Sequence, residues 1–377
     1  MREPVDLRRQ RILAVVQSRG ATRVSDLAAE LAVSVVTVRR DVEELAREGR
    51  LRRGHGVARP VLTENERAAA PPEPAADGGP VALVVPERHA YLYEALHGAR
   101  TVFEEAGIRI ALHIAPAVSG AEQPLVERAL AEGARGLLIA PRWRSRATEE
   151  ADYTWLSRLT VPAVVMERRP RRGSALHAVD TVCTDHWYGV HLAVEHLTGL
   201  GHRRVVLAAR DDSPTARAVR SAFREIAADH PGIDKWAVAL SAPGAVPDPA
   251  AAASDAAAVE LPALLSELGA TAAVLHGDVD ALMLVQALRD SGLRVPEDCS
   301  AVAYDDVVAG LGSTPLTAVS PPKTEVGRAA AELLLRRLAD PAAAASPVRR
   351  LELLPSLQVR GSTQPPPEAV APTLASQ

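Results

Sequence analysis

A short stretch near the amino terminus carries side chains whose types and spacing suit contacts with the base edges and phosphates of a nucleic acid. Arginine can donate paired hydrogen bonds to a guanine edge or bind a phosphate, and the methyl groups of valine or threonine can touch a thymine methyl. The residues concerned are Val36, Thr37, Arg39 and Arg40. Because three glutamates lie in the same stretch, the alternative interpretation is a surface helix with an ordinary charged face.

These residues are positioned by a helix that is predicted between Ser34 and Gly49. Ser34 is a favourable N-cap, because its hydroxyl can accept a hydrogen bond from an N–H group of the first turn, and Gly49 is a typical stop signal. Apolar residues at helical spacing predict a buried stripe on the opposite side, formed by Val35, Val38, Val42, Leu45 and Ala46. The polar side, together with the Ser34 cap, is therefore the expected nucleic-acid surface.

Further helices are predicted at 7–19 and 26–32, with an extended piece at 21–24. The segment RLRRGHGVAR, residues 50–59, predicts two short strands joined through glycines. Such a wing would bring Arg52, Arg53 and His55 near the backbone of a duplex. Phosphate contacts of this kind fix the register, while the helix reads the bases. Residues 1–58 are thus predicted to form a small α+β winged helix-turn-helix domain that binds double-stranded DNA.

The charge distribution supports this division of the chain. The first 60 residues carry 13 arginines against 8 acidic residues, whereas the remainder carries 30 basic and 39 acidic residues. A basic amino-terminal module on an acidic body indicates that only the first part contacts a polyanion.

The rest of the sequence predicts a linker and a larger α/β domain. Residues 59–79 are rich in proline, alanine and glycine and lack apolar periodicity, which is typical of a semi-extended linker. From 80 to 363, short apolar runs alternate with helical segments, as expected for parallel strands with crossover helices in two similar lobes. Residues 364–377 are expected to form a disordered tail. The apolar runs lie at 81–85, 108–114, 136–140, 163–166, 205–209, 271–275 and 300–304.

Candidate ligand-binding residues follow several of these runs. In open α/β sheets a ligand binds outside the carboxyl ends of the strands. Polar and aromatic side chains at those positions can hydrogen-bond and stack on a small molecule. His89 and Tyr91 follow the first run, Arg142 and Trp143 follow the run at 136–140, and the crossover VDTVCTDHW (179–187) supplies Asp185 and Trp187. Asp185 also suits the N-cap of the following helix, so both roles stay open for it.

Several function classes find no support in the sequence. Cys183 and Cys299 are too few and too far apart for a disulfide framework or a metal site. No G-x-S-x-G elbow, phosphate-binding loop or H-E-x-x-H pattern is present, so we expect no catalytic site, metal or cofactor. No apolar span of membrane length and no export signal are present, and we expect a cytoplasmic protein without a membrane partner.

The amino-terminal module resembles the DNA-binding domain of the DeoR family of bacterial regulators. The run VSVVTVRRDVEEL (33–45) matches the VS-xx-TVRRD-xxx-L pattern, and GRLRRGHG (49–56) matches G-x-L-x-R-x-H-G. The family usually has a second glycine where this chain has Val57.

Residues 80–363 resemble the effector domain of the LacI/GalR family, which is itself similar to periplasmic sugar-binding proteins. Ordered stretches carry the resemblance: TDHWYGVHLAVEHLTGLGHRRVVLAA, HGDVDALMLVQALRDSGLRVPEDCSAVAYDD, TPLTAVSPPKTEVGRAAAELLLRRL and LLPSLQVRGST. The resemblance implies ligand contacts from Arg220 (or Arg217), Asp278 and Asp305, and a polyhydroxylated, sugar-like ligand.

Together the resemblances imply a transcription regulator, by default a repressor, whose operator binding a small sugar-like effector controls. They also imply a homodimer, possibly a tetramer, on a pseudo-palindromic site. The alternatives are an activator or a co-repressor-dependent regulator, a cytoplasmic solute-binding protein, and a sugar-modifying enzyme with a regulatory head.

Overall fold

The computed structural model divides the chain into a first unit, Met1–Ala75, and a second unit, Ala76–Gln377. It describes residues 5–19, 22–31, 33–48, 50–54, 57–60, 78–87, 90–116, 118–143, 146–211, 213–241, 261–339 and 346–367. The division falls inside the predicted linker, most of which lies outside the described residues.

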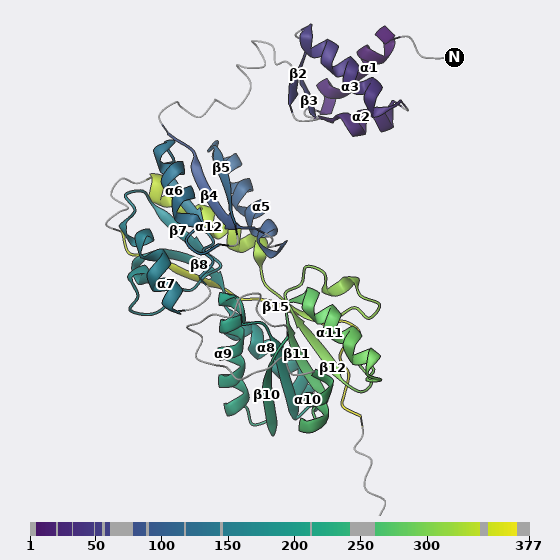
Figure 1. Cartoon of the computed structure of the whole chain (residues 1–377), viewed down its shortest axis with the longest axis vertical. Helices are drawn as coiled ribbons and strands as arrows, with labels where there is room; N and C mark the ends of the chain where they lie inside the picture. Colours follow the sequence, from purple (N-terminus) through teal and green to yellow (C-terminus); the bar gives the residue numbers. More distant parts are fainter. Residues whose placement is uncertain are drawn as a thin grey trace, which may run out of the picture. The chain divides into compact units, whose positions relative to one another are not determined.

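The first unit has the predicted winged helix-turn-helix elements (Figure 1). Its strands form an antiparallel sheet in the order β1-β3-β2. The helices are α1 (Val5–Arg19), α2 (Val24–Glu30) and α3 (Val35–Arg47), and the strands are β1 (Thr22–Arg23), β2 (Leu51–Gly54) and β3 (Val57–Pro60). One apolar core joins them, with Ile12, Leu27 and Leu45 fully buried.

The buried face of α3 differs from the predicted stripe at its ends. Val35 is 42% exposed, because it begins the first turn and no element covers it. Asp41 is buried instead, and its carboxylate accepts hydrogen bonds from Nε of Arg8 at 2.7 Å and Nε of Arg9 at 3.3 Å. A buried carboxylate is tolerated when it is paired in this way, so Asp41 ties α1 to α3.

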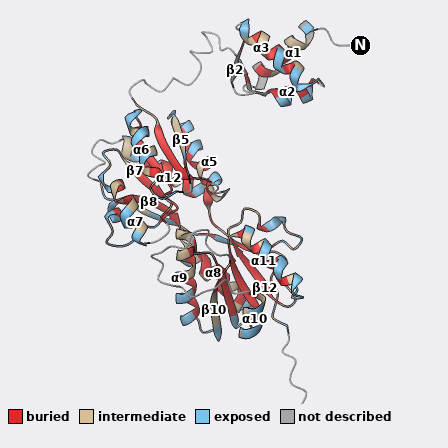
Figure 2. Ribbon diagram, in the orientation of Figure 1, coloured by how far each residue is buried: buried red, intermediate tan, exposed pale blue. Residues whose placement is uncertain are grey.

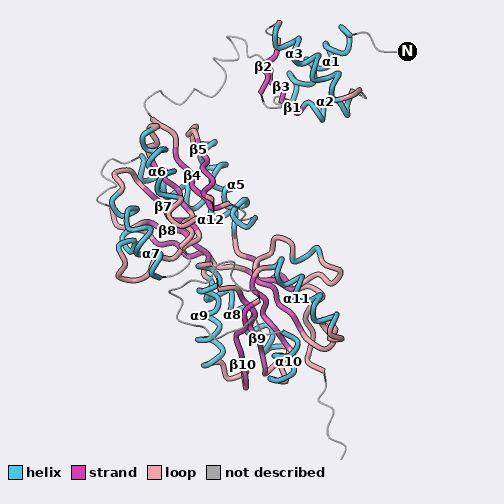
Figure 3. Tube along the Cα trace, viewed as in Figure 1, coloured by secondary structure: helices cyan, strands magenta, loops and turns pink. Residues whose placement is uncertain are grey.

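The second unit consists of two α/β lobes (Figures 1 and 3). The first lobe has a parallel sheet in the order β14-β8-β7-β6-β4-β5. Its strands are β4 (Val81–Pro86), β5 (Ile110–Ala115), β6 (Gly136–Ile139), β7 (Ala163–Met166), β8 (Asp180–Thr184) and β14 (Arg350–Leu353). Its helices are α5 (Ala90–Glu105), α6 (Glu122–Ala131), α7 (Arg146–Tyr153) and α12 (Lys323–Ala339), with short 3-10 turns at Thr154–Arg158 and Ala175–Ala178.

The second lobe repeats this plan with strand order β10-β9-β11-β12-β13-β15, in which only the β13–β15 pair is antiparallel among the described strands. Its strands are β9 (Arg204–Ala209), β10 (Lys235–Leu240), β11 (Ala272–His276), β12 (Ser300–Tyr304), β13 (Thr317–Ser320) and β15 (Ser356–Gln358). Its helices are α8 (His186–Gly199), α9 (Pro214–Asp229), α10 (Leu261–Leu268) and α11 (Asp278–Asp290), with a 3-10 turn at Ala309–Leu311. Figure 2 shows buried strands between helices whose outer faces are exposed.

The two-lobed prediction is confirmed, but several strands were not predicted. Residues 180–184, predicted as part of a crossover, form the buried strand β8. Strands β14 and β15 alternate leucine with polar residues and are only exposed or half-buried, so neither stands out as an apolar run. The chain passes between the lobes after β8, after β13 and after β14. None of the described helices is long and apolar enough to cross a membrane.

The predicted tail begins too early. Gln364 is held in place by two contacts of its carbonyl oxygen. This oxygen accepts a hydrogen bond from the Ser300 hydroxyl and lies 2.9 Å from Nε2 of His202. Nδ1 of His202 in turn contacts the Thr271 hydroxyl at 2.7 Å. His202, fully buried, therefore fastens the end of the domain to the second sheet. Residues 368–377 lie outside the described part of the chain.

Two glycines allow a close helix contact in the first lobe. A Cβ on Gly327 of α12 would fall well inside the van der Waals radius of the Ala95 carbonyl oxygen on α5. A Cβ on Gly98 of α5 would collide in the same way with the Thr324 carbonyl. The two backbones thus touch directly where these helices cover the sheet.

We expect Gly327→Ala to lower the free energy of unfolding by about 3 kcal/mol, because the rigid backbone of α5 must move to admit the methyl group. Urea unfolding followed by tryptophan fluorescence measures this, since all four tryptophans lie in the second unit. Gly199→Ala is the control: this helical glycine has no described atom within 4 Å of its Cβ position, and alanine there should be neutral or stabilising. Equal effects of the two substitutions would contradict the assigned contact.

Candidate DNA-binding surface and effector cleft

The outer face of α3 presents the predicted DNA-contacting residues. Val36 is 74% exposed, Arg39 and Arg40 are exposed, and Thr37 is half-buried. Neither arginine forms an ion pair with another described residue, whereas Arg47 at the other end of the helix pairs with Glu44 at 2.6 Å. The guanidinium groups of Arg39 and Arg40 are therefore available to a ligand outside the protein.

Ser34 caps this helix as predicted. Its Oγ accepts a hydrogen bond from the Thr37 backbone N–H at 3.2 Å and lies 2.8 Å from the Thr37 hydroxyl. The cap holds the exposed amino-terminal turn, which carries Val36 and Thr37.

We expect Ser34→Ala to destabilise the first turn of α3 by about 1 kcal/mol, because one backbone N–H loses its acceptor. Faster hydrogen–deuterium exchange in residues 35–38 would report this. Ser25→Ala, which changes an exposed serine inside α2, should leave exchange in α3 unchanged. An unchanged rate in Ser34→Ala would refute the capping role.

The wing is present in the backbone. β2 pairs with β3 in antiparallel register, with Arg52 opposite Arg59 and Arg53 opposite Ala58. The side chains of Arg52 and Arg53 and the whole of His55 lie outside the described residues, so their DNA contacts stay predictions.

In the second unit, a cleft of about 550 Å³ lies between the lobes. Its walls are the segments that follow β6 and β7, the end of β8 and Glu149 of α7 in the first lobe, and the beginning of α8 and one side of α9 from Pro214 to Glu225 in the second. The wall from the first lobe lies at the carboxyl ends of parallel strands, where ligands of such sheets bind. The size suits a small ligand.

Three of the predicted ligand-binding residues line this cleft, namely Trp143, Trp187 and Arg220. Trp187 is 41% exposed, is stacked on His191 and donates from Nε1 to Glu225 at 3.1 Å. Trp143 is only 2% exposed and packs edge-on against Tyr153. Arg217, the alternative to Arg220, also lines the cleft.

Other predicted residues make internal contacts. Asp185 caps α8, because its carboxylate accepts from the Tyr188 N–H at 2.9 Å. Oδ2 of Asp278 accepts three backbone hydrogen bonds, at 2.5 to 3.2 Å, from Val307, Val308 and Ala309. Both carboxylates therefore have a structural role, and their ligand contacts stay predictions. Arg142 is half-buried and is not among the residues of the cleft wall, and His89 lies outside the described residues.

Tyr91 and Asp305 are close to the cleft wall without lining it. The Tyr91 hydroxyl donates to Oε1 of Glu167 at 2.9 Å, and Glu167 lines the cleft. Asp305 follows β12 with a φ of 77°, and its Oδ1 is buried without a described hydrogen-bond partner. Burial, followed by the negative charge of Asp278, raises the pKa of Asp305 to about 7.

The segment after β7 supplies cleft residues that the sequence interpretation missed. Glu167, Arg168, Arg169 and Arg171 follow AVVM directly. Their place directly after a buried strand is the signal in the sequence that points to them. Arg168 is buried, and its guanidinium donates to the Pro141 carbonyl at 2.6 Å and to the Glu167 carbonyl at 2.7 Å.

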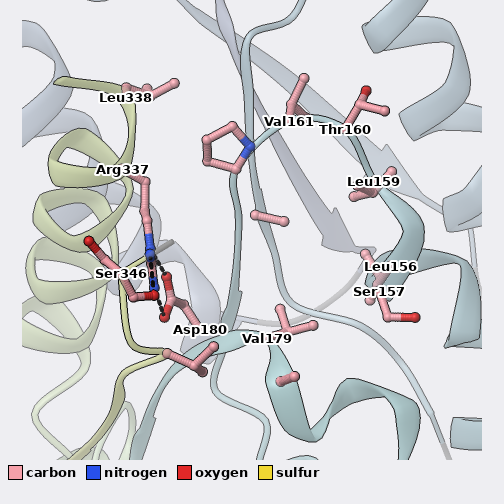
Figure 4. A pocket seen from close by; sticks show the side chains of 14 residues that line it. Leu156, Ser157, Leu159, Thr160, Val161, Val179, Asp180, Arg337, Leu338 and Ser346 are labelled. Carbon is pink, nitrogen blue, oxygen red and sulfur yellow. Dashed lines mark hydrogen bonds and ion pairs between the residues drawn. The ribbon is translucent and has the colours of Figure 1, made fainter. Parts of the chain in front are cut away.

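A further cavity of about 530 Å³ lies in the first lobe at the amino ends of β7 and β8 (Figure 4). Its lining is largely aliphatic, and Arg337 on α12 forms a bidentate ion pair with Asp180 there, at 2.6 and 2.9 Å. This ion pair is internal and the cavity is at the opposite strand ends, so the cleft between the lobes is the better candidate for a ligand site. Within the described residues, no group of three or more His, Cys, Asp or Glu side chains could hold a metal ion, and both cysteines are free and buried.

Comparison with known families agrees with both parts of this description. Residues 8–63 match the DeoR-like helix-turn-helix domain, and residues 194–363 match the periplasmic binding protein-like domain.

Individual proteins extend the likeness along the chain. The arabinose metabolism transcriptional repressor of Geobacillus stearothermophilus is 26% identical over 90% of each chain. The transcriptional repressor PurR of Haemophilus influenzae is 30% identical over 54% of this chain and 58% of its own length. A crystal structure of the lac repressor dimer bound to operator and the anti-inducer ONPF has the same fold. Its TM-score is 0.60 at 19% identity, over 81% of this chain and 99% of that one. This chain therefore carries a DeoR-like helix-turn-helix domain and a periplasmic binding protein-like domain, and it is similar in sequence to transcriptional repressors.

Proposed function

We propose that the protein is a cytoplasmic repressor that binds a specific DNA operator through α3 and the wing, and that a small sugar-like effector in the cleft releases it. The observation that carries this proposal is the pair of exposed arginines Arg39 and Arg40, without an ion pair to any described residue, on a capped helix in the same chain as an interlobe cleft. The named relatives are repressors, which supports repression over activation.

We further propose residues 1–58 as the DNA-binding domain, 59–79 as the linker and 80–363 as the effector and dimerisation domain. A homodimer would place two heads on a pseudo-palindromic site. The lac repressor structure is a dimer on its operator, and its likeness of fold supports this arrangement.

The test begins with selection of duplexes bound by the full-length protein from a random pool. The recovered sequence is then compared with its scrambled version at the same salt concentration, because phosphate contacts alone bind any sequence. A repressor of this kind should prefer the selected site by roughly 10³-fold or more, and one class of sugar or sugar derivative should abolish that preference. Equal affinity for both duplexes would refute the proposal.

A further inference from the structure

The cleft between the lobes is unusually rich in positive charge. Six arginines and three glutamates are among the residues that line it. The arginines are Arg168, Arg169, Arg171, Arg217, Arg220 and Arg224. His186 adds no charge at neutral pH, because burial, with Arg168 and His276 nearby, lowers its pKa to about 3.

Among the described residues, the glutamates of the cleft form no ion pair with these arginines. Glu149 accepts hydrogen bonds from the Arg171 backbone N–H at 2.8 Å and from the Ser174 hydroxyl at 3.1 Å. Glu225 accepts from the Trp187 indole, and Glu167 from the hydroxyls of Tyr91 and Thr184. Burial raises the pKa of Glu167, while the hydrogen bonds from Tyr91 and Thr184 and the charge of Arg168 lower it. The ion pairs of Arg169 and Arg171 are instead made with Glu352 and Glu150, which do not line the cleft.

Three arginines of the cleft donate to backbone carbonyl groups and form no ion pair with a described residue. Arg168 donates to Pro141 and Glu167 carbonyls, Arg220 to the Ala209 carbonyl at 3.4 Å, and Arg224 to the Arg220 carbonyl at 3.5 Å. A guanidinium has five N–H donors, so further donors remain on each. Burial, and for Arg220 the neighbouring Arg224, lowers the pKa of Arg168 and Arg220. Arg168 and Arg220 therefore hold positive charge that is partly withdrawn from water, which an anionic ligand compensates better than a neutral one.

We infer that the effector of this cleft carries an anionic group, a phosphate ester or a carboxylate, which Arg220 and Arg224 on α9 bind opposite Arg168. The inference rests on the proposed role of the cleft as the effector site, and it names the chemical class of the effector. Planar guanidinium groups recognise such oxyanions through paired, charge-assisted hydrogen bonds. The first turn of α9 also lines the cleft, through Pro214 and Thr215, and helix amino termini favour anions.

The experiment uses inorganic phosphate as the probe on the full-length protein, with thermal unfolding followed by tryptophan fluorescence. Phosphate should raise the midpoint in wild type more than in the double variant Arg220→Gln/Arg224→Gln. Because phosphate also stabilises proteins by general exclusion, Arg203→Gln serves as the matched control. Arg203 is exposed in the same lobe and pairs with Asp234 outside the cleft. An equal phosphate effect in all three proteins, or none in any of them, would overturn the inference.

A second arm separates the two anion sources. Glucose, glucose 6-phosphate and glucuronate are titrated by calorimetry into wild type and the double variant. The inference is supported if glucose 6-phosphate or glucuronate binds wild type at least roughly tenfold tighter than glucose does, and if the double variant loses this difference. The tighter of the two charged sugars then shows whether the anionic group is a phosphate or a carboxylate. Tighter binding of glucose would contradict it. If the protein binds DNA sequence-specifically and a neutral sugar releases it, the proposed repressor function is supported and the inference of an anionic effector is wrong. Absence of any sequence preference would refute the repressor whatever the phosphate result.

Discussion

Replacing Arg39 and Arg40 together by alanine is expected to weaken binding to the selected operator by roughly 30-fold to 10⁴-fold. Each lost base contact by an arginine costs about 1–3 kcal/mol. Both side chains are exposed and unpaired among the described residues, so their removal should not unfold the domain. The measurement is fluorescence anisotropy of the labelled operator and of its scrambled version, at several salt concentrations.

The control for this prediction removes the same charge elsewhere. Arg203→Ala/Arg204→Ala changes two adjacent exposed arginines of the second unit and should leave operator affinity nearly unchanged. Comparing the operator with its scrambled version also shows whether Arg39 and Arg40 contact bases or phosphates. A loss confined to the operator indicates base contacts, whereas an equal loss on both DNAs with a shallower salt dependence indicates phosphate contacts. Unchanged affinity for both DNAs in the Arg39/Arg40 variant would remove α3 as the recognition helix.

The helices and strands of both units were predictable where the side-chain types of a segment match its burial in the structure. Ser34 is a cap by side-chain chemistry alone, and strands such as β4 and β11 are uniformly buried and almost entirely apolar. Strands β14 and β15 were not predictable, because their side chains are largely exposed and only pairing with neighbours makes them strands.

The sequence predicts the location of the site, at the carboxyl ends of strands, better than it predicts which contacts each side chain makes. The rule that ligands bind beyond strand ends led to Trp143 and Trp187, both in the cleft wall. It cannot show that Asp278 accepts three backbone hydrogen bonds, because the donors come from a loop about 30 residues away in sequence. Nor can sequence distinguish Arg168, buried against carbonyl groups, from the exposed Arg169 beside it.

Asp305 gives the protein a second large and measurable effect, on stability as a function of pH. Its Oδ1 is buried, and the charged groups that act on it are Asp278 and Glu167, which disfavour ionisation, and Lys323, which favours it. Burial is the largest cause, and the pKa of Asp305 is raised to about 7. An aspartate in the unfolded chain ionises near pH 3.9. Between these values the native state keeps a proton that the unfolded state has lost, so the protonated carboxyl stabilises the fold below pH 4 and this stabilisation is lost as pH rises towards 7.

We therefore expect the free energy of unfolding of Asp305→Asn, relative to wild type, to rise with pH between about 4 and 7. The slope should approach about 1.4 kcal/mol per pH unit, roughly 4 kcal/mol in all, and level off above pH 7. Asparagine also tolerates the left-handed backbone at this position. Urea unfolding at half-unit pH steps, followed by tryptophan fluorescence, measures the difference. Asp229→Asn, on the exposed end of α9, controls for removal of one negative charge. A pH-independent difference would show that Asp305 ionises in the folded protein as it does in the unfolded chain.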